Sequence, residues 1–440
     1  MPGLLTLVLA HLPTAAAFCG TYVGPAGAEL YNHVSQVAIG RDGTQTTLTL
    51  ANDAEGDLSS FALVVPVPQG LTQDDVDVVE DGLFTRLDEY STPRLVRYEC
   101  EDFDYYDHLA LADAAGGGDG SGGTDEPDVD GVSVQAEFSA GEYDIVVLDA
   151  TGSEGLLSWL NEHGYEVPGQ ASDVLQSYIE AGNQFLAARV DLPELSPTHA
   201  NLRPLQLRYE SDALTLPLRL GTVNSAGVQD LLLYVVSDGD SGRVGIANYP
   251  EVEVQDECMI ELGLLQEHRD FGEFWQESFD EARQGHDRAA WIEEYSWSPA
   301  KCDPCSAAPL TDEEVRAVGF EGEATEAFFT RLHLRFTPSQ IDQDLSFYRS
   351  GDTASSQVRF IEYDRYLEEH FPVCGVGWTP APRTCDEEPE VRARLGCEVP
   401  LRPSWSVVMW VLGLLSIRRR GRGTLGSGRA RGPGRPPALG

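Results

Sequence analysis

The feature that most constrains this chain is a large excess of acidic residues combined with enough apolar residues to form a core. The 440 residues include 72 Asp and Glu against 30 Lys and Arg, and 42% are hydrophobic. Eight of the basic residues but only one acid follow Cys397, so residues 18–397 carry a balance of −49. Self-repulsion keeps such a body soluble, and its field attracts cations or basic partners. We therefore expect an acidic but folded protein.

The same composition excludes two classes of protein. Nucleic-acid binding needs clustered Lys and Arg to neutralise phosphates, whereas this chain has a formal net charge of −42. A polytopic membrane protein needs apolar runs of about 18 residues or more, which the sequence lacks. The predicted partners therefore include no nucleic acid.

The first 17 residues predict a secretory signal peptide. Leu4–Ala10 is a short apolar core, Pro13 breaks it, and Ala15–Ala17 supplies the small residues that a signal peptidase needs. We expect cleavage between Ala17 and Phe18. A short buried helix is the alternative interpretation, because no Lys or Arg precedes the apolar core.

Export favours disulfide bonds among the cysteines. The candidates for structural disulfides are Cys19, Cys100, Cys258, Cys302, Cys305, Cys374 and Cys385, and their pairing stays open. The C-x-x-C pair Cys302 and Cys305 is also compatible with a redox motif or half of a zinc site. No second pair of ligands at similar spacing accompanies it, and Pro304 and Pro309 indicate a loop.

Apolar periodicity predicts an α+β fold with antiparallel sheets and short packing helices. The predicted strands are Gln45–Leu50, Phe61–Pro68, Tyr143–Asp149, Phe185–Val190, Leu202–Tyr209, Leu214–Leu220 and Leu231–Ser237. The predicted helices begin at Asp81, Ser153, Ser172 and Thr311, and Thr311 with Glu314 forms a capping box before the last of them, which Gly319 ends. A further amphipathic helical region is expected over Cys258–Tyr295, and its aromatic residues, Trp291 among them, are expected to pack in the core.

Along the chain we expect seven segments. They are a signal peptide at 1–17, a β-rich lobe at 18–112, an acidic glycine-rich linker or insertion at 113–131, an α+β lobe at 132–257, a helical segment at 258–300, a cysteine-containing part at 301–397, and a hydrophobic sorting or anchor segment with an Arg-rich tail at 398–440.

The sequence predicts no catalytic residue and no cofactor. It lacks H-E-x-x-H, G-x-S-x-G and the P-loop pattern. The acidic linker lacks the calcium-loop spacing, so calcium is a minor alternative and metal ligands stay unknown. Asp102–His108 gathers acids, aromatics and one His, which fits a cation site, the wall of a carboxylate active site or, more simply, a solvated loop.

Several short segments resemble one bacterial family. They are Phe61–Pro68, Leu83–Leu95, Tyr143–Leu148, Leu160–Pro168, Pro217–Leu220, Phe329–Phe336 and Asp344–Phe347. The family is an exported one known as domain of unknown function 2330, and the resemblance covers roughly residues 18–365. It implies export, and it carries no catalytic residue to this chain.

The C-terminal region resembles the sorting tags of myxobacterial surface proteins. Cys397 is followed by the apolar stretch Trp405–Ile417 and then by Arg418, Arg419 and Arg420. This stretch of 13 residues spans about 20 Å as a helix against a ~30 Å hydrocarbon core. A transient anchor that a peptidase removes explains this length best, with Cys397 as the modified residue. A retained membrane anchor and an ordinary amphipathic helix are the alternatives.

These observations predict an exported bacterial protein at the cell surface, in the outer membrane or outside the cell. Its C-terminal segment would contact the inner membrane at least transiently. The absence of catalytic motifs favours a structural or binding role. A carboxylate-based extracytoplasmic hydrolase is the alternative function.

Overall fold

The structure is a computed structural model of the chain. It describes residues 21–23, 30–31, 35–56, 61–68, 70–80, 82–98, 131–163, 167, 171–190, 199–225, 227–260, 271–303, 305–368 and 370–375. The chain divides into two units, Met1–Cys385 and Asp386–Gly440, and all of these residues belong to the first.

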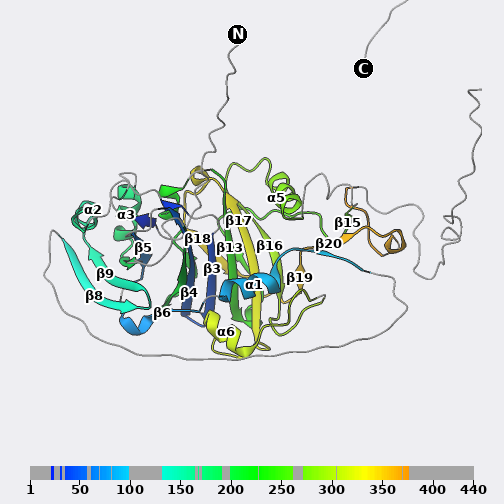
Figure 1. Cartoon of the computed structure of the whole chain (residues 1–440), viewed down its shortest axis with the longest axis horizontal. Helices are drawn as coiled ribbons and strands as arrows, with labels where there is room; N and C mark the ends of the chain where they lie inside the picture. Colours follow the sequence, from blue (N-terminus) through cyan, green and yellow to red (C-terminus); the bar gives the residue numbers. More distant parts are fainter. Residues whose placement is uncertain are drawn as a thin grey trace, which may run out of the picture. The chain divides into compact units, whose positions relative to one another are not determined.

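Two sheets that pack face to face form the centre of this unit (Figure 1). The larger has the order β19-β16-β17-β13-β3-β4-β11-β6, with β2 also paired to β4, and the smaller has the order β1-β5-β10-β9-β8. The larger contains β2 (Leu30–Tyr31), β3 (Ser35–Asp42), β4 (Gln45–Gly56), β6 (Val76–Val78), β11 (His199–Glu210), β13 (Gln229–Asp238), β16 (Ala290–Trp297), β17 (Ala327–Phe336) and β19 (Ser356–Gln357). The smaller contains β1 (Thr21–Val23), β5 (Phe61–Val67), β8 (Val132–Ala140), β9 (Tyr143–Ala150) and β10 (Gln184–Val190).

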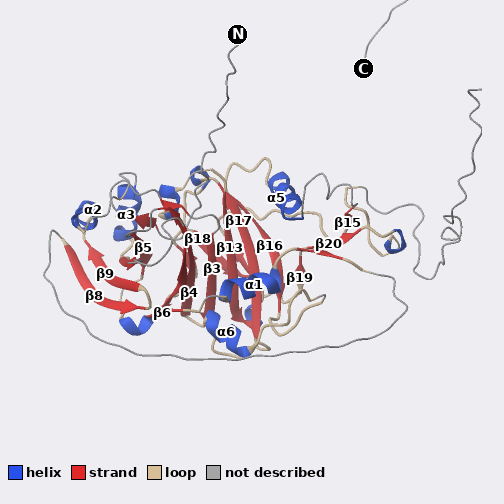
Figure 2. Ribbon diagram, in the orientation of Figure 1, coloured by secondary structure: helices blue, strands red, loops and turns tan. Residues whose placement is uncertain are grey.

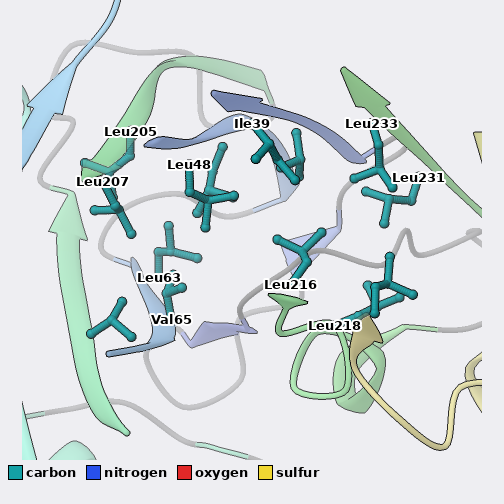
Figure 3. Packing of buried hydrophobic residues seen from close by; sticks show 14 of the residues in the cluster. Ile39, Leu48, Leu63, Val65, Leu205, Leu207, Leu216, Leu218, Leu231 and Leu233 are labelled. Atoms are coloured by element: carbon teal, nitrogen blue, oxygen red, sulfur yellow. The ribbon is translucent and has the colours of Figure 1, made fainter. Parts of the chain in front are cut away.

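The main core lies between these two sheets, because both contribute alternate apolar side chains to the same cluster. Leu233 and Val235 of β13 point into it, whereas Tyr234 between them faces the other side of the sheet. Figure 3 shows Leu48 of the large sheet beside Leu63 and Val65 of the small one.

Helices cover the outer face of each sheet, which gives four layers in the order α, β, β, α (Figure 2). The small sheet carries α2 (Ser153–Glu162) and α3 (Ala171–Glu180), and the large sheet carries α1 (Leu83–Ser91), α5 (Phe271–Ala282) and α6 (Asp312–Val318).

The remaining elements are short. One three-stranded sheet has the order β12-β18-β14 and contains β12 (Thr215–Leu216), β18 (Leu345–Arg349) and β14 (Val244–Ile246). A second has the order β15-β20-β7 and contains β15 (Met259–Ile260), β20 (Arg359–Glu362) and β7 (Arg94–Val96). The described 3-10 helices are η1 (Gln73–Asp75), η2 (Gly221–Asn224), η3 (Gly239–Ser241), η4 (Pro338–Gln340) and η5 (Arg365–Leu367).

The α+β prediction is confirmed, although the sheets are mixed. Most neighbouring strands are antiparallel, but β13 runs parallel to β3. The capping box predicted before α6 is also confirmed. The Glu314 amide donates to Thr311 Oγ1 over 3.2 Å, the Thr311 amide donates to Glu314 Oε2 over 2.7 Å, and the helix ends at Gly319 in the left-handed conformation.

Three kinds of local prediction need correction, and the first concerns the start of two helices. Gly82, with a φ of 107°, is the N-cap of α1, so the helix begins later than Asp81, which lies outside the described residues. Gly152 and not Ser153 is the N-cap of α2.

The second correction concerns the helix expected over Cys258–Tyr295. Only Phe271–Ala282 of the described residues there is helical, whereas β15 and β16 are strands. Trp291 is buried in the core between the two sheets as expected, but from a strand.

The third correction concerns Leu214–Leu220, where only Thr215–Leu216 is a strand. Pro217 follows directly and has no N–H to continue a ladder.

Among the helices that the structure describes, none is long and apolar enough to cross a membrane.

Candidate functional site

Many residues singled out from the sequence lie outside the part of the chain that the structure describes. These are the cleavage residues Ala17 and Phe18, the stretch Asp102–His108, the cysteines Cys19, Cys100 and Cys385, and the C-terminal residues Cys397, Trp405, Ile417, Arg418, Arg419 and Arg420. Signal cleavage, sorting and anchoring therefore stay predictions.

The other four candidate cysteines lie in two pairs at bonding distance. The sulfurs of Cys258 and Cys374 are 2.02 Å apart, and those of Cys302 and Cys305 are 1.81 Å apart. Cys258 is fully buried beside β15, and the Cys374 amide donates to the Met259 carbonyl over 3.0 Å. This pair therefore ties residues near the C-terminal end of the described chain to the sheet of β15, β20 and β7.

Three basic side chains on β17 form the centre of a buried ionic network. Arg331, His333 and Arg335 alternate with Leu332 and Leu334, whose side chains belong to the core between the two sheets. Successive strand residues point to opposite faces. The basic groups therefore lie on the outer face of the large sheet, on the side that α1 and α5 cover.

Glu294 of β16 joins two of these basic groups. Its Oε2 lies 2.5 Å from Nε of Arg331, and its Oε1 lies 2.8 Å from Nδ1 of His333. The indole N–H of Trp275 on α5 also donates to Oε1 over 3.0 Å. The Glu294 side chain is only 1% exposed, so these partners offset a large desolvation cost.

Acids from three further elements complete the network. Asp230 of β13 lies 2.8 Å from His333 Nε2, and it accepts from Arg335 over 2.9 Å. Asp280 of α5 accepts from Arg335 Nε over 3.0 Å. Asp88 of α1 accepts from Arg331 Nη1 over 2.7 Å. The network thus connects both helices to the three strands β13, β16 and β17.

The charges of the network stabilise one another. Burial alone lowers the pKa of His333, but Glu294 and Asp230 outweigh it and raise the pKa to about 9. Burial alone raises the pKa of Glu294, yet Arg331 and His333 bring it below its usual value. His333 is therefore an imidazolium at neutral pH, with each ring N–H facing a carboxylate.

This arrangement is that of a structural network and not of a catalytic group. Arg331, His333 and Glu294 are each held by charged protein partners. The segment Phe329–Phe336 resembles the bacterial family, but its basic residues carry no motif that singles them out from the sequence. The available signal was their period of two within an apolar strand, in a chain with few basic residues.

A cleft of about 890 Å³ lies at one end of the large sheet. The parallel neighbours β3 and β13 both end there, as does β16, and β17 begins there. We call it the strand-end cleft. Its charged and aromatic lining consists of Asp42, Asp238, Asp240, Glu326, Lys301, Arg349, Trp297, Phe320 and Phe328.

The backbone around the cleft is fixed by close contacts. The Gly239 amide donates to the Glu326 carbonyl over 2.7 Å, and a Cβ at residue 239 would lie only 2.7 Å from that oxygen. Asp238 Oδ1 accepts from the Asp240 amide over 3.2 Å. Within the described residues the Lys301 ammonium has no hydrogen bond or ion pair. The cleft therefore presents both signs of charge, and backbone contacts fix the position of part of its rim.

Carboxyl groups with a raised pKa lie elsewhere. Burial, with Glu257 nearby, raises the pKa of Asp256 to about 6. Burial and Glu293 raise the pKa of Glu251. Neither lines the strand-end cleft. In the described part of the chain, no three His, Cys, Asp or Glu side chains are grouped so that they could hold a metal ion.

The comparisons with known proteins identify the family. A family model described as an uncharacterized protein conserved in bacteria, DUF2330, matches residues 13–348. The chain belongs to this family. The DUF2330 match includes the whole ionic network, whereas Arg349 of the cleft and Cys374 lie beyond it.

The other comparisons add no function to this DUF2330 protein. No curated protein matches the chain. Among solved structures, the crystal structure of baculovirus P35 is similar at 10% identity and a TM-score of 0.29, over 74% of this chain and 99% of that chain. A likeness at this level carries no argument about function.

Proposed function

We propose that this DUF2330 protein is exported to the bacterial surface and acts by binding a partner in the strand-end cleft. The cleft itself carries the proposal, because it is large and lined by aromatic and charged side chains. Carboxylates outnumber cations in its lining. The partner surface is therefore expected to be basic overall, with a carboxylate or similar acceptor for Lys301.

Export has separate support. The two cysteine pairs at bonding distance suit an oxidising compartment. The apolar residues before Phe18 suit a signal peptide. The stretch Trp405–Ile417 with the arginines behind it would hold the chain at the inner membrane until a peptidase acts near Cys397.

A carboxylate-based hydrolase stays the alternative. Such an enzyme needs a free acid and base that face one hollow. Glu294, the most deeply buried carboxylate among the described residues, is instead held by Arg331 and His333. Asp256, whose pKa is raised, lies outside the cleft. Binding therefore accounts for the described residues more simply than catalysis.

Sedimentation with cell envelopes tests the binding role. Purified protein is mixed with envelopes from the bacterium that carries it, and the bound fraction is compared with that of a triple variant, Asp238→Asn, Asp240→Asn and Glu326→Gln. The amides keep the shape and the acceptor oxygens but remove the charge. We expect the wild type to sediment, binding to weaken with salt, and the variant to lose about tenfold in affinity.

A matched control removes three exposed acids from the opposite helical layer, through Glu154→Gln, Asp173→Asn and Glu180→Gln. It should sediment like the wild type. Equal binding of both triple variants would place the partner elsewhere. Release of soluble fragments from the envelopes by the wild type alone would favour the hydrolase.

A further inference from the structure

A second cavity, of about 240 Å³, lies beside the C-terminal end of α3, where β5 and β11 end. We call it the Arg219 cavity. Its lining consists of Leu48, Pro66, Val67, Pro68, Ser177, Tyr178, Ala181, Asn183, Tyr209, Ser211, Thr215, Pro217, Arg219 and Asp344. It shares no residue with the strand-end cleft.

One carboxylate oxygen fixes the backbone that carries Arg219. Asp344 Oδ1 accepts the amides of Leu218 and Arg219 over 2.9 and 3.0 Å. The Tyr178 hydroxyl donates to the same oxygen over 2.6 Å. Because Pro217 ends β12, these amides have no strand partner, and Asp344 supplies their acceptor.

The charged groups of the cavity keep unused bonding capacity. The Arg219 guanidinium donates from Nη1 to Ser177 Oγ over 3.0 Å, and among the described residues it makes no ion pair. A guanidinium has five N–H donors in a flat fork. Asp344 Oδ2 likewise receives no donor from the described residues. A cationic fork and a carboxylate oxygen thus line one small cavity.

The rest of the lining is mixed, with Asn183, Ser211 and Thr215 among its polar residues, and one part of it is apolar. Leu48, Pro66 and Pro68 line the cavity, and Figure 3 shows Leu48 in the core between the two sheets. Ring and aliphatic walls favour an apolar group between the two charges. The volume is below the ~300–1,000 Å³ typical of sites for drug-sized ligands, so it suits a ligand of one residue.

We propose that the Arg219 cavity binds a free amino acid with an apolar side chain. The ligand carboxylate pairs with the Arg219 guanidinium, the ligand ammonium donates to Asp344 Oδ2, and the side chain packs against Leu48 and the prolines. Each charge of the zwitterion meets the opposite charge of the protein, which a half-buried site requires. This inference is independent of the role proposed for the strand-end cleft.

Matched ligands test it on the purified full chain. Calorimetry and thermal unfolding compare L-leucine with 4-methylpentanoate, which lacks the ammonium, and with 3-methylbutylamine, which lacks the carboxylate. We expect leucine to bind and to raise the midpoint of unfolding. Each analogue should bind at least about tenfold more weakly, because it leaves one charge of the cavity unpaired.

A pair of variants locates the site. Arg219→Gln should weaken leucine binding about tenfold to a hundredfold, whereas the exposed Arg316→Gln on α6 should leave it unchanged. The proposal is overturned if leucine at millimolar concentration neither binds nor stabilises, if 4-methylpentanoate binds as tightly, or if Arg219→Gln binds like the wild type. If Arg219→Gln does not fold, the comparison of leucine with its two analogues on the wild-type protein decides whether the proposal holds.

Discussion

Replacing Glu294 by Gln tests whether the ionic network holds the outer helices to the large sheet. The substitution keeps the size of the side chain and an acceptor for Trp275, but it removes the charge that faces Arg331 and His333. Breaking a buried ion pair from one side costs about 3–5 kcal/mol. We expect about 3 kcal/mol, because Asp88 and Asp230 still pair with the two cations.

The pH dependence gives a second signature. The pKa of His333 is raised from 6.5 to about 9 in the folded state. A raised pKa means stability that is fully present below pH 6.5 and is lost as the pH rises through about 9, here on the order of 3 kcal/mol. Without the Glu294 charge the pKa of His333 falls, so the variant should lose less stability between pH 6.5 and 9.

Urea unfolding followed by tryptophan fluorescence measures both quantities, because Trp275 and Trp291 are buried. The control is Glu281→Gln, an exposed position on α5, which should change stability by less than about 0.5 kcal/mol. A Glu294→Gln protein with the stability and pH slope of the wild type would refute the network as an energetic feature.

Three further outcomes are expected for the cysteines. Replacing Cys258 and Cys374 by Ala, a pair separated by 116 residues, should cost about 2–5 kcal/mol in urea unfolding without reductant, and an unchanged midpoint would mean that the bond does not stabilise the protein. Alkylation of the unreduced mature protein should leave Cys302 and Cys305 unmodified in mass spectra, and two free thiols or stoichiometric zinc would contradict this. Peptide mapping of protein from its native cell should find no sequence beyond the Cys397 region, and an intact C-terminus at Gly440 would exclude processing.

Strand β5 and helix α6 could be predicted from the sequence, because the residues that determine them lie within or next to each element. The unbroken apolar run Phe61–Pro68 predicts a strand that is buried on both faces, and Leu63 to Val67 of β5 are buried. The capping box of Thr311 and Glu314 predicted the start of α6. Each of these signals lies within a few residues of the element that it predicts.

The strand β16 was missed because its cause is not local. Its residue Trp291 belongs to a series of aromatic residues among acids that favours an amphipathic helix, with Phe271, Phe274, Trp275 and Phe279. Pairing with β17 on one side and β19 on the other overrides that preference. The parallel contact of β3 with β13 joins segments almost two hundred positions apart and has no signal in either strand alone.

The ionic network and both cavities escaped prediction for the same reason. The acid partners of β17 come from four different elements, and sequence alone must choose them from 72 acids. Asp344 and Arg219 lie in segments that were recognised as family-like, yet only the fold brings them to one cavity. Spatial convergence, not local pattern, defines these sites.

Labelling of Lys301 on living cells tests the central claim most directly. Lys301 is the single lysine of the chain, it is exposed, and it lines the strand-end cleft. An amine-reactive reagent that cannot cross membranes is applied to intact cells and to the purified protein, and the peptide with Lys301 is quantified. If the protein is exported and its cleft is occupied, Lys301 should be labelled on intact cells, at a rate well below that of the purified protein. Labelling only after lysis would contradict export, and equal rates would contradict a partner in the cleft.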